Sequence, residues 1–310
     1  MRKYLVTGGC GFIGSHLADA LCAAGHGVRI LDDLSTGRLH NAPAAAEVVV
    51  AHVADAAQVG RAMLGVDGCF HLAAVASVQR SNEAWMATHA INLGGTICVL
   101  DAARAERVPV VFASSAAVYG RQNAHAVDET RSPAPLTAYG ADKLGSELHA
   151  RVAGLVHGVP TLGLRFFNVF GPRQDGRSPY SGVISIFVDR LARGAPLDLY
   201  GDGRQARDFV HVSDVVRFLL AGMQKVDVTG PVFNVCTGTP TSIRDLATTI
   251  AQICGVRAVM RFHPPRMGDI QWSLGCPERA ARHLGLVTSV RLEEGLRNTL
   301  QGIAIRPEAA

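Results

Sequence analysis

Residues 1–33 read MRKYLVTGGCGFIGSHLADALCAAGHGVRILDD, in which two apolar runs flank three glycines and a helical pattern over 12–24. The glycines, Gly8, Gly11 and Gly14, fall three residues apart. In a strand–loop–helix turn the first glycine permits a tight turn, the second lets the backbone approach a pyrophosphate, and the third lets helix and strand pack closely. The free N–H groups at the start of the helix attract the phosphates. The stretch therefore predicts a dinucleotide site.

A carboxylate ends the second apolar run of this stretch. Asp32 follows the glycines by about twenty residues, where an acid accepts hydrogen bonds from both hydroxyls of an adenosine ribose. A carboxylate at this place would repel the additional phosphate of NADP, so the prediction is NAD. The alternative is that Asp32 and Asp33 only cap a turn, because "DDLSTG" is also a turn sequence.

The same strand–helix rhythm continues through the first half of the chain. Apolar runs "KYLVTG", "GVRILD", "EVVVAHV", "GCFHLAA", "VPVVFASS" and "PTLGLRF" alternate with helical patterns over 55–65, 83–106 and 137–157. Strands that are apolar on both faces and alternate with helices predict a parallel sheet covered on both sides. We therefore expect an α/β fold, with a doubly wound (Rossmann) domain over residues 1–168.

After about Phe167 the rhythm gives way to loops rich in glycine and proline, separated by helical patterns over 183–193 and 242–254. This change predicts a smaller C-terminal lobe over residues 169–310 whose loops face a ligand. Some of its segments are expected to return to the first domain.

Composition narrows the class of protein. The 310 residues are 48% hydrophobic and 18% charged, and the net charge of +4 is too small to predict a nucleic acid or membrane partner, although it suits an anionic metabolite. Seven cysteines are scattered without a CxxC pair, which predicts buried thiols and no metal site. No apolar run is long enough to span a bilayer and none precedes the first strand as a signal peptide, so we expect a cytoplasmic protein.

A second constellation lies in "SSAAVYG" (114–120) and "LTAYGADKLGSE" (136–147). Tyr139 and Lys143 are four residues apart in a helical pattern, so both side chains share one face. A phenol titrates near pH 10 and becomes a base near neutrality only when a close ammonium, helped by a positively charged nicotinamide, stabilises the phenolate. Ser115, at the end of the preceding strand, is placed to hydrogen-bond the same substrate oxygen. The alternative is a strand-end serine and a packed helix tyrosine.

Taken together, the motifs resemble those of the extended short-chain dehydrogenase/reductases that act on nucleotide sugars. The resemblance covers essentially the whole chain through "TGGCGFIGSHL", "LDDLSTG", "FHLAA", "INLGGT", "FASSAAVYG", "YGADK", "RFFNVFGPRQ", "GDGRQARDFVHVSDV" and "RMGD". Within that family the sequence is most similar to the UDP-hexose 4-epimerases, which hold NAD tightly and oxidise and re-reduce C4 of the sugar. The resemblance also implies a homodimer in which helices 83–106 and 137–157 pair with their mates in a four-helix bundle.

The resemblance implies roles for individual residues. Ser115, Tyr139 and Lys143 are the expected catalytic residues. The expected NAD-binding residues, besides Tyr139 and Lys143, are Gly8, Gly11, Phe12, Ile13, Gly14, Asp32, Asp33, Leu34, Ser35, Thr36, Gly37, His52, Val53, Leu72, Ala73, Ala74, Ala76, Asn92 and Phe167. The expected UDP-sugar contacts are Asn168, Gly182, Val183, Tyr200, Arg207, Arg266, Asp269 and Ser273. The two arginines suit a diphosphate, which a guanidinium can grip with two hydrogen bonds.

Several positions depart from the family pattern. His52 stands where an aspartate usually meets the adenine amino group, Ala76 replaces a lysine of some galactose epimerases, and Gly275 replaces a usual aspartate. Ala116 and Ala117 replace the Asp-Glu pair of the related 4,6-dehydratases, and eliminating water needs that acid and base. Decarboxylating relatives also carry a glutamate at 117. These alanines therefore favour an epimerase over a dehydratase or decarboxylase.

Two other readings use the same residues. A reductase would exchange a reduced cofactor, normally NADPH, against which Asp32 argues. An NAD-binding protein without activity would be expected to lose Tyr139 or Lys143, and both are present. For the sugar itself, Ser273 borders the pocket beside the C2 substituent in the epimerases that this chain resembles. A serine there predicts room for an N-acetyl group, and Trp272 or a shifted loop is the alternative occupant of that space.

Overall fold

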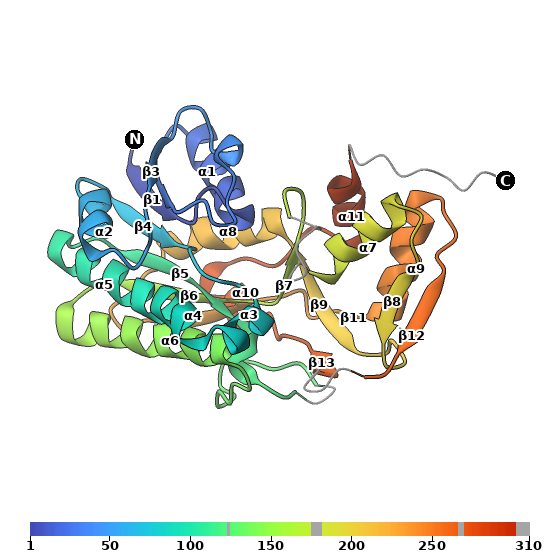
Figure 1. The fold of residues 1–310 in the computed structure, drawn as a ribbon. Helices are drawn as coiled ribbons and strands as arrows, with labels where there is room; N and C mark the ends of the chain where they lie inside the picture. The colour runs from blue at the N-terminus through green and yellow to red at the C-terminus, as the bar shows by residue number, and fades with distance from the viewer. Residues whose placement is uncertain (123–124, 175–181, 266–269, 302–310) are drawn as a thin grey trace.

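The first lobe is built around one parallel sheet (Figure 1). The computed structural model describes residues 1–310 except 123–124, 175–181, 266–269 and 302–310. The sheet has seven strands in the order β10-β6-β5-β4-β1-β2-β3, every adjacent pair parallel. Their bounds are β1 (Lys3–Thr7), β2 (Gly27–Asp32), β3 (Glu47–Val50), β4 (Gly68–His71), β5 (Val110–Ser115), β6 (Thr161–Phe166) and β10 (Val232–Val235). The first six match the six apolar runs, so the predicted doubly wound sheet is confirmed.

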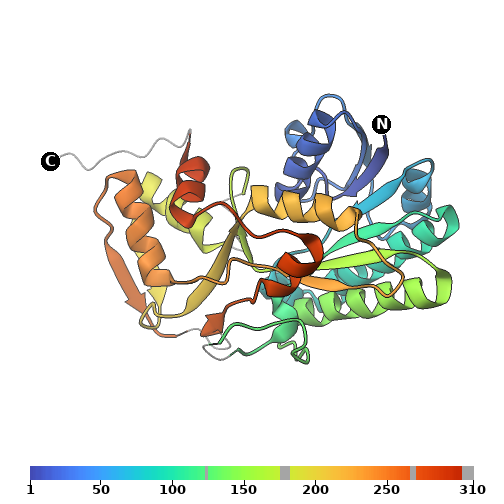
Figure 2. The ribbon, with the colours of Figure 1, turned by 180° about the vertical axis from the view of Figure 1, so that it is seen from behind.

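Helices cover both faces of this sheet. On one face lie α1 (Phe12–Ala23), α8 (Val212–Met223) and α10 (Glu278–Leu284). The other carries α2 (Ala56–Met63), α5 (Gly95–Glu106) and α6 (Ala138–His157). Figure 2, seen from behind, shows α8 and α10 in front of the sheet and the α5–α6 pair beyond it. Because the chain winds to β3 and then crosses back to place β4 beside β1, the carboxyl ends of these two strands form the switch point at which open α/β sheets bind their ligands.

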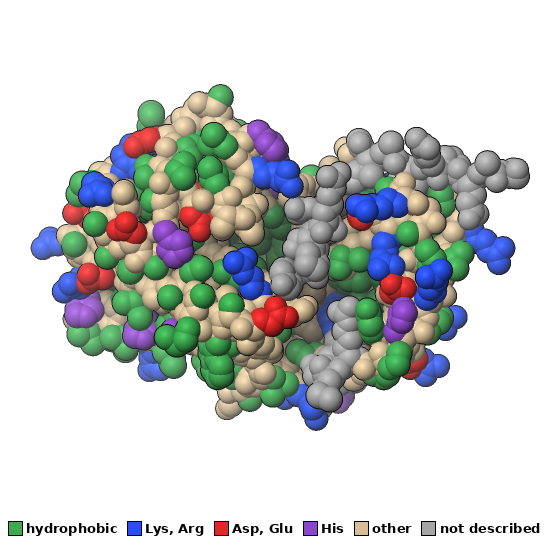
Figure 3. Space-filling model, viewed as in Figure 1, with side chains coloured by type: hydrophobic (Ala, Val, Ile, Leu, Met, Phe, Trp, Pro, Cys, Tyr) green, Lys and Arg blue, Asp and Glu red, His purple; other side chains and the backbone are tan. Residues whose placement is uncertain are grey.

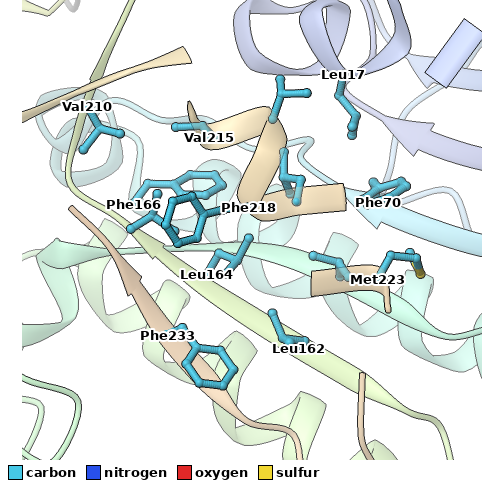
Figure 4. Packing of buried hydrophobic residues seen from close by; sticks show 14 of the residues in the cluster. Leu17, Phe70, Leu162, Leu164, Phe166, Val210, Val215, Phe218, Met223 and Phe233 are labelled. Atoms are coloured by element: carbon cyan, nitrogen blue, oxygen red, sulfur yellow. The ribbon is translucent and has the colours of Figure 1, made fainter. Parts of the chain in front are cut away.

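The core lies between the sheet and each helical layer. All six residues of β6 are buried, as expected for a central strand of a parallel sheet. Figure 4 shows Leu162, Leu164 and Phe166 of this strand turned toward the layer that contains Phe218 of α8. Burying each such side chain stabilises the fold by about 1.5–3 kcal/mol. A second cluster fills the opposite face, under α2, α5 and α6.

The helical pattern over 83–106 is more broken than the sequence indicates. A short helix, α3 (Val78–Glu83), is separated by the single residue Ala84 from the next helix, α4 (Trp85–His89). A π-helical turn over Ala90–Gly94 then leads into α5. The extra residue in a π turn changes which face of the helix each following side chain occupies. Gly95 allows this segment to pack closely against the turn that follows β3, since a Cβ there would lie 2.6 Å from Cγ1 of Val53.

The second lobe is smaller and consists of short elements. Its strands are β7 (Asn168–Phe170), β8 (Leu197–Tyr200), β9 (Ala206–His211), β11 (Pro240–Ser242), β12 (Met260–His263) and β13 (Trp272–Ser273). β11, β9 and β13 form a sheet that β7 joins through β9, and β8 pairs with β12. The helices α7 (Val183–Ala192), α9 (Ile243–Cys254) and α11 (Leu292–Leu300) pack around a core of their own. Three elements within residues 169–310 belong to the first lobe: β10 is a strand of the large sheet, and α8 and α10 pack against that sheet.

Candidate active site

The turn between β1 and α1 has no room for a side chain at Gly8 or Gly14. Gly8 has a φ of +70°, and a Cβ there would lie 2.8 Å from the backbone nitrogen of Ala73. A Cβ at Gly14 would overlap the carbonyl oxygen of Gly8. Gly11 is the N-cap of α1, and in the described part of the chain no side chain caps that end of the helix. The exposed N–H groups and the bare backbone fit a phosphate group.

Asp32 is held beside this turn. Its Oδ2 accepts a hydrogen bond from the backbone N–H of Cys10 and its Oδ1 from that of Leu34, both at 2.9 Å. Burial raises the pKa of Asp32, and these two bonds partly oppose the rise. Gly37 closes over the carboxylate, because a Cβ there would lie 2.7 Å from Oδ1. A buried carboxylate favours further hydrogen-bond donors, such as the hydroxyls of a ribose, so these residues fit NAD.

The other expected NAD contacts follow the carboxyl ends of the neighbouring strands. Asp33–Gly37 follow β2, and His52 and Val53 follow β3. Leu72, Ala73, Ala74 and Ala76 follow β4, and Phe167 follows β6. His52 accepts a hydrogen bond through Nδ1 from the N–H of Ala54 at 3.2 Å, and its Nε2 lies 4.0 Å from Oδ2 of Asp33. Because Nδ1 of His52 accepts from Ala54, Nε2 is the nitrogen of this ring that can donate to another group.

A buried polar chain that the sequence reasoning missed supports this edge of the sheet. The Thr7 hydroxyl accepts hydrogen bonds from the N–H groups of Leu72 and Ala73, both at 3.2 Å, and contacts Nδ1 of His71 at 2.8 Å. Nε2 of His71 contacts the Thr96 hydroxyl at 3.0 Å. Burial, with a smaller contribution from Lys143, lowers the pKa of His71 to about 3. His71 is therefore neutral and fixes the loop after β4.

Asn92 sits in the π-helical turn and holds the same loop. Its Oδ1 accepts from the N–H of Val75 at 2.8 Å, and its Nδ2 donates to the carbonyl of Val75 at 3.3 Å. The amide of Asn92 thus pairs with both the N–H and the carbonyl of Val75, as the backbone of a neighbouring strand would. Asn92 is buried, so these bonds satisfy an amide that would otherwise be costly. The Asn92 side chain therefore holds the loop after β4 in place.

Ser115, Tyr139 and Lys143 meet at the end of β5. The Ser115 hydroxyl oxygen accepts from the N–H of Ala117 at 3.1 Å and also hydrogen-bonds with Tyr139. Lys143 donates from Nζ to the carbonyl of Ala113 at 2.8 Å, and Nζ lies 5.8 Å from the centre of the Tyr139 ring. Helix α6 begins one residue before Tyr139, so tyrosine and lysine lie one turn apart on its first turns.

Burial controls the titration of this pair. It raises the pKa of Tyr139, and the hydrogen bond with Ser115 lowers it by less. It lowers the pKa of Lys143 to about 8, against the opposing charges of Asp142 and Glu147. By themselves these residues keep Tyr139 as a neutral phenol at neutral pH. They leave Lys143 as an ammonium that loses its proton in mild alkali. The phenolate state therefore needs an additional positive charge.

A buried ion pair braces the helix that carries these residues. Nε and Nη2 of Arg165, on β6, donate to the two oxygens of Glu147 at 2.8 and 2.7 Å. Oε1 of Glu147 also accepts from the Ser114 hydroxyl at 2.5 Å. Arg165 donates further to the Tyr119 hydroxyl at 2.9 Å, which donates to Asn234 at 2.7 Å. The network joins α6 to β5, β6 and β10 one turn beyond Lys143.

The expected UDP-sugar residues gather in the second lobe. Asn168 begins β7, Arg207 lies on β9, and Ser273 pairs with Arg207 in the parallel ladder between β13 and β9. Tyr200 ends β8, Gly182 is the N-cap of α7, and Val183 is the first residue of that helix. Arg207 donates from Nη1 to the carbonyl of Ala206 at 2.9 Å. Arg266 and Asp269 lie outside the described residues. On the face in Figure 3 the surface is hollowed between the two lobes.

Asp208 fixes this part of the second lobe and was missed in the sequence. Its Oδ1 accepts from the N–H and the hydroxyl of Thr237, both at 2.7 Å. Its Oδ2 accepts from the N–H groups of Gly238, at 2.9 Å, and Gly275, at 3.3 Å. A Cβ at Gly275 would lie 2.6 Å from Sγ of Cys236. Gly275, which replaces a usual aspartate of the family, thus packs against the thiol of Cys236. The available signal was a carboxylate directly before two apolar residues in "ARDFVH".

Comparisons with known proteins agree with this geometry. Residues 4–236 match the model of the NAD dependent epimerase/dehydratase family. The chain belongs to this family. It is 39% identical over 308 residues to a UDP-glucose 4-epimerase of Mycolicibacterium smegmatis, a match that covers 96% of this chain and 97% of the relative.

Two solved structures share the whole fold. The UDP-glucose 4-epimerase of Thermotoga maritima, determined with UDP-glucose, has a TM-score of 0.92 at 34% identity and covers 96% of this chain and 97% of its own. The UDP-N-acetylglucosamine 4-epimerase of Methanobrevibacter ruminantium, in complex with UDP-N-acetylmuramic acid, has a TM-score of 0.92 at 31% identity and 97% coverage of both chains. In the described part of this chain no helix is long and apolar enough to cross a membrane, and no cluster of three metal-ligating side chains occurs.

Proposed function

We propose that the protein is an NAD-dependent 4-epimerase of UDP-hexoses. The observation that carries the proposal is the meeting of Ser115, Tyr139 and Lys143 at the end of β5, beside a glycine turn and a buried Asp32 that fit NAD. The relatives named above, which match over nearly their entire length, support the same activity.

The chain's own residues perform the proton chemistry. Tyr139, as a phenolate, accepts the proton of the sugar 4-hydroxyl, and the Ser115 hydroxyl steadies the oxygen as the 4-keto sugar forms. The Lys143 ammonium, anchored to Ala113, stabilises the phenolate. When bound, NAD⁺ supplies the hydride acceptor at C4 of its nicotinamide and a positive charge. Once the ketosugar has turned, Tyr139 returns its proton to the sugar 4-oxygen, and the hydride held by the bound cofactor would return to the opposite face of C4, so that C4 is inverted without net redox change.

The residues after Ser115 disfavour elimination. Ala116 and Ala117 begin a short 3-10 helix, Ala116–Tyr119, and neither side chain can act as an acid or a base. A 4,6-dehydratase needs both functions near C5 and C6. The ketosugar therefore keeps its C6 hydroxyl and is reduced again at C4. Arg207, with Arg266 and Asp269, is proposed to hold the diphosphate and ribose while the sugar turns.

Product analysis tests the function. The purified protein is incubated with UDP-glucose, UDP-galactose, UDP-GlcNAc and UDP-GalNAc without added reductant, and the nucleotide sugars are separated. We expect each accepted sugar to approach a mixture with its C4 epimer. A 4-keto-6-deoxy product would instead identify a dehydratase, and unchanged sugars with bound NAD would identify a protein without this activity.

Three finer features complete the proposal. The buried Ser273 beside Arg207 supports turnover of the N-acetylated pair in addition to the plain one. Exposed apolar side chains on α6, Leu148, Val152, Leu155 and Val156, support a homodimer through the α5–α6 face, where apolar side chains are seen in Figure 3. All seven cysteines lie in the described ranges as free thiols, which supports a reducing, cytoplasmic setting.

A further inference from the structure

The tyrosine at the end of β8 is stacked on a histidine. The rings of Tyr200 and His263 lie with their centres 5.3 Å apart and their planes 30° from parallel. The two residues are also direct partners in the parallel ladder between β8 and β12. Because a stacked neighbour restricts rotation of an aromatic side chain, His263 limits the orientations that the Tyr200 ring can adopt.

His263 is itself held in place by charged side chains of the second lobe. Nε2 of His263 contacts Oδ1 of Asp198 at 2.9 Å, and Oδ2 of Asp198 contacts Nη1 of Arg190 at 2.6 Å. Arg190 lies on α7 and also donates to the carbonyl of Pro196 at 2.9 Å. The chain Arg190–Asp198–His263 therefore connects α7 to the ring of Tyr200. The hydrogen bond with His263 is the main cause that lowers the pKa of Asp198, so this carboxylate is ionised at neutral pH.

A pocket of about 750 Å³ opens at this ring pair. Besides Tyr200 and His263, its lining includes Phe262, Gln205, Gln271 and Arg244. Aromatic faces together with amides that both donate and accept suit a flat heterocycle with alternating carbonyl and N–H groups. Gln205 lies two residues before Arg207, and Gln271 lies two residues before Ser273. The pocket therefore adjoins the strands β9 and β13, which carry the proposed diphosphate and sugar contacts.

We propose that His263 is a positioning residue that holds Tyr200 as the stacking platform for the base of the UDP-hexose. This inference rests on the proposed function. Nucleotide binding depends on the ring stack between Tyr200 and His263, and not on the hydrogen bond between His263 and Asp198. His263 acts on ground-state binding of the nucleotide and does not take part in the proton transfers at Tyr139.

Three substitutions separate the stack from the hydrogen bond. His263→Ala removes both, His263→Phe keeps a ring without a donor, and His263→Asn keeps a donor without a ring. The matched control is His26→Ala, because His26 contacts Tyr4 at the same centroid distance of 5.3 Å, edge to face, in the first lobe. Each variant is tested for thermal unfolding, for UDP binding by calorimetry, and for kcat and KM with UDP-glucose.

We expect His263→Ala and His263→Asn to raise the Kd for UDP and the KM for UDP-glucose by about tenfold, with kcat changed by less than about twofold. His263→Phe should return both constants to within about threefold of wild type, and His26→Ala should leave them unchanged. Wild-type binding in His263→Ala, or rescue by asparagine but not by phenylalanine, would overturn the inference. A wild-type protein that neither binds UDP nor converts any UDP-hexose would instead overturn the proposed function.

Discussion

Lys143 on α6 is hydrogen-bonded to the backbone of the strand that ends in Ser115: its Nζ lies 2.8 Å from the carbonyl oxygen of Ala113. The bond offsets part of the cost of burying the ammonium. It also fixes the distance between the helix that carries Tyr139 and the strand that carries the serine. Helix α6 and strand β5, which this bond joins, thus define the position at which a sugar hydroxyl would be held.

The first prediction concerns pH. Burial lowers the pKa of Lys143 to about 8, so its charge is present below that pH and is lost as the pH rises through it. We expect kcat/KM for UDP-glucose to fall above about pH 8. In Lys143→Arg the maximum rate should be lower, but the alkaline fall should move to higher pH, because a guanidinium stays protonated. An alkaline limb at the same pH in both proteins would contradict this role.

The second prediction concerns the base. Tyr139→Phe keeps the ring and removes the phenolic oxygen, so kcat should fall by about 10²–10⁴-fold, the usual effect of a lost general base. Bound NAD and the melting temperature should change little. Tyr4→Phe, a buried ring far from the end of β5, is the control and should keep normal turnover. The mechanism fails if the Tyr139 variant remains as active as wild type.

The third prediction concerns the cofactor. Denaturing the purified protein should release NAD(H), and Asp32→Ala should weaken NAD far more than NADP, because the carboxylate is the expected partner of the ribose hydroxyls. Asp32→Asn keeps the shape and removes the charge, so it should admit NADP with a smaller loss of NAD. Nicotinamide released from each variant and dinucleotide titrations give the comparison. Release of NADP from the wild type would refute the assignment.

The sequence predicted the first lobe well because its signals are local. Each strand of a two-sided parallel sheet is an apolar run, and the glycines of residues 8–14 form a recognisable spacing within one short stretch, although the backbone that Gly8 approaches is that of Ala73. The second lobe was less predictable: β13 is only two residues long, and its place beside β9 depends on pairing between segments over sixty residues apart. Patterns of hydrophobicity carry no information of that range.

Side-chain networks were the least predictable part of the site. His71 reads as one residue of "FHLAA", yet its neutrality and its place between Thr7 and Thr96 depend on three separate elements. The π turn at Asn92 was equally hidden, because its register follows from packing against Val75 rather than from local propensity. Asp208 and His263 were missed for the same reason.

The fourth prediction concerns assembly. Leu148 and Val152 lie one turn apart on α6 and are at least half exposed, so in a homodimer they would be covered. Leu148→Glu combined with Val152→Glu should produce a monomer, because a buried interface does not tolerate unpaired carboxylates. Val259→Glu, an equally exposed position in the second lobe, should leave the mass unchanged. Sedimentation at micromolar concentration provides the measurement, and a wild-type monomer would exclude the dimer.

The last prediction concerns the sugar. Ser273 is buried and lies beside Arg207 in the β13–β9 ladder, so its side chain adjoins the proposed diphosphate contacts. A serine lacks the ring that would overlap an acetamido group at C2, and such overlap in a dense pocket cannot be relieved at low cost. We therefore expect the wild type to interconvert UDP-GlcNAc and UDP-GalNAc as well as UDP-glucose and UDP-galactose.

Two substitutions at this position make the prediction decisive. Ser273→Tyr should reduce kcat/KM for the N-acetylated pair by more than about tenfold and spare the plain pair. Ser273→Ala keeps the space and should leave the ratio of the two activities near that of wild type. If wild type converts only the plain pair, or if the tyrosine leaves the ratio unchanged, then Trp272 or the path of the adjacent backbone, and not Ser273, determines the space at C2. The epimerase assignment would survive that result, because it depends on Tyr139 and Lys143.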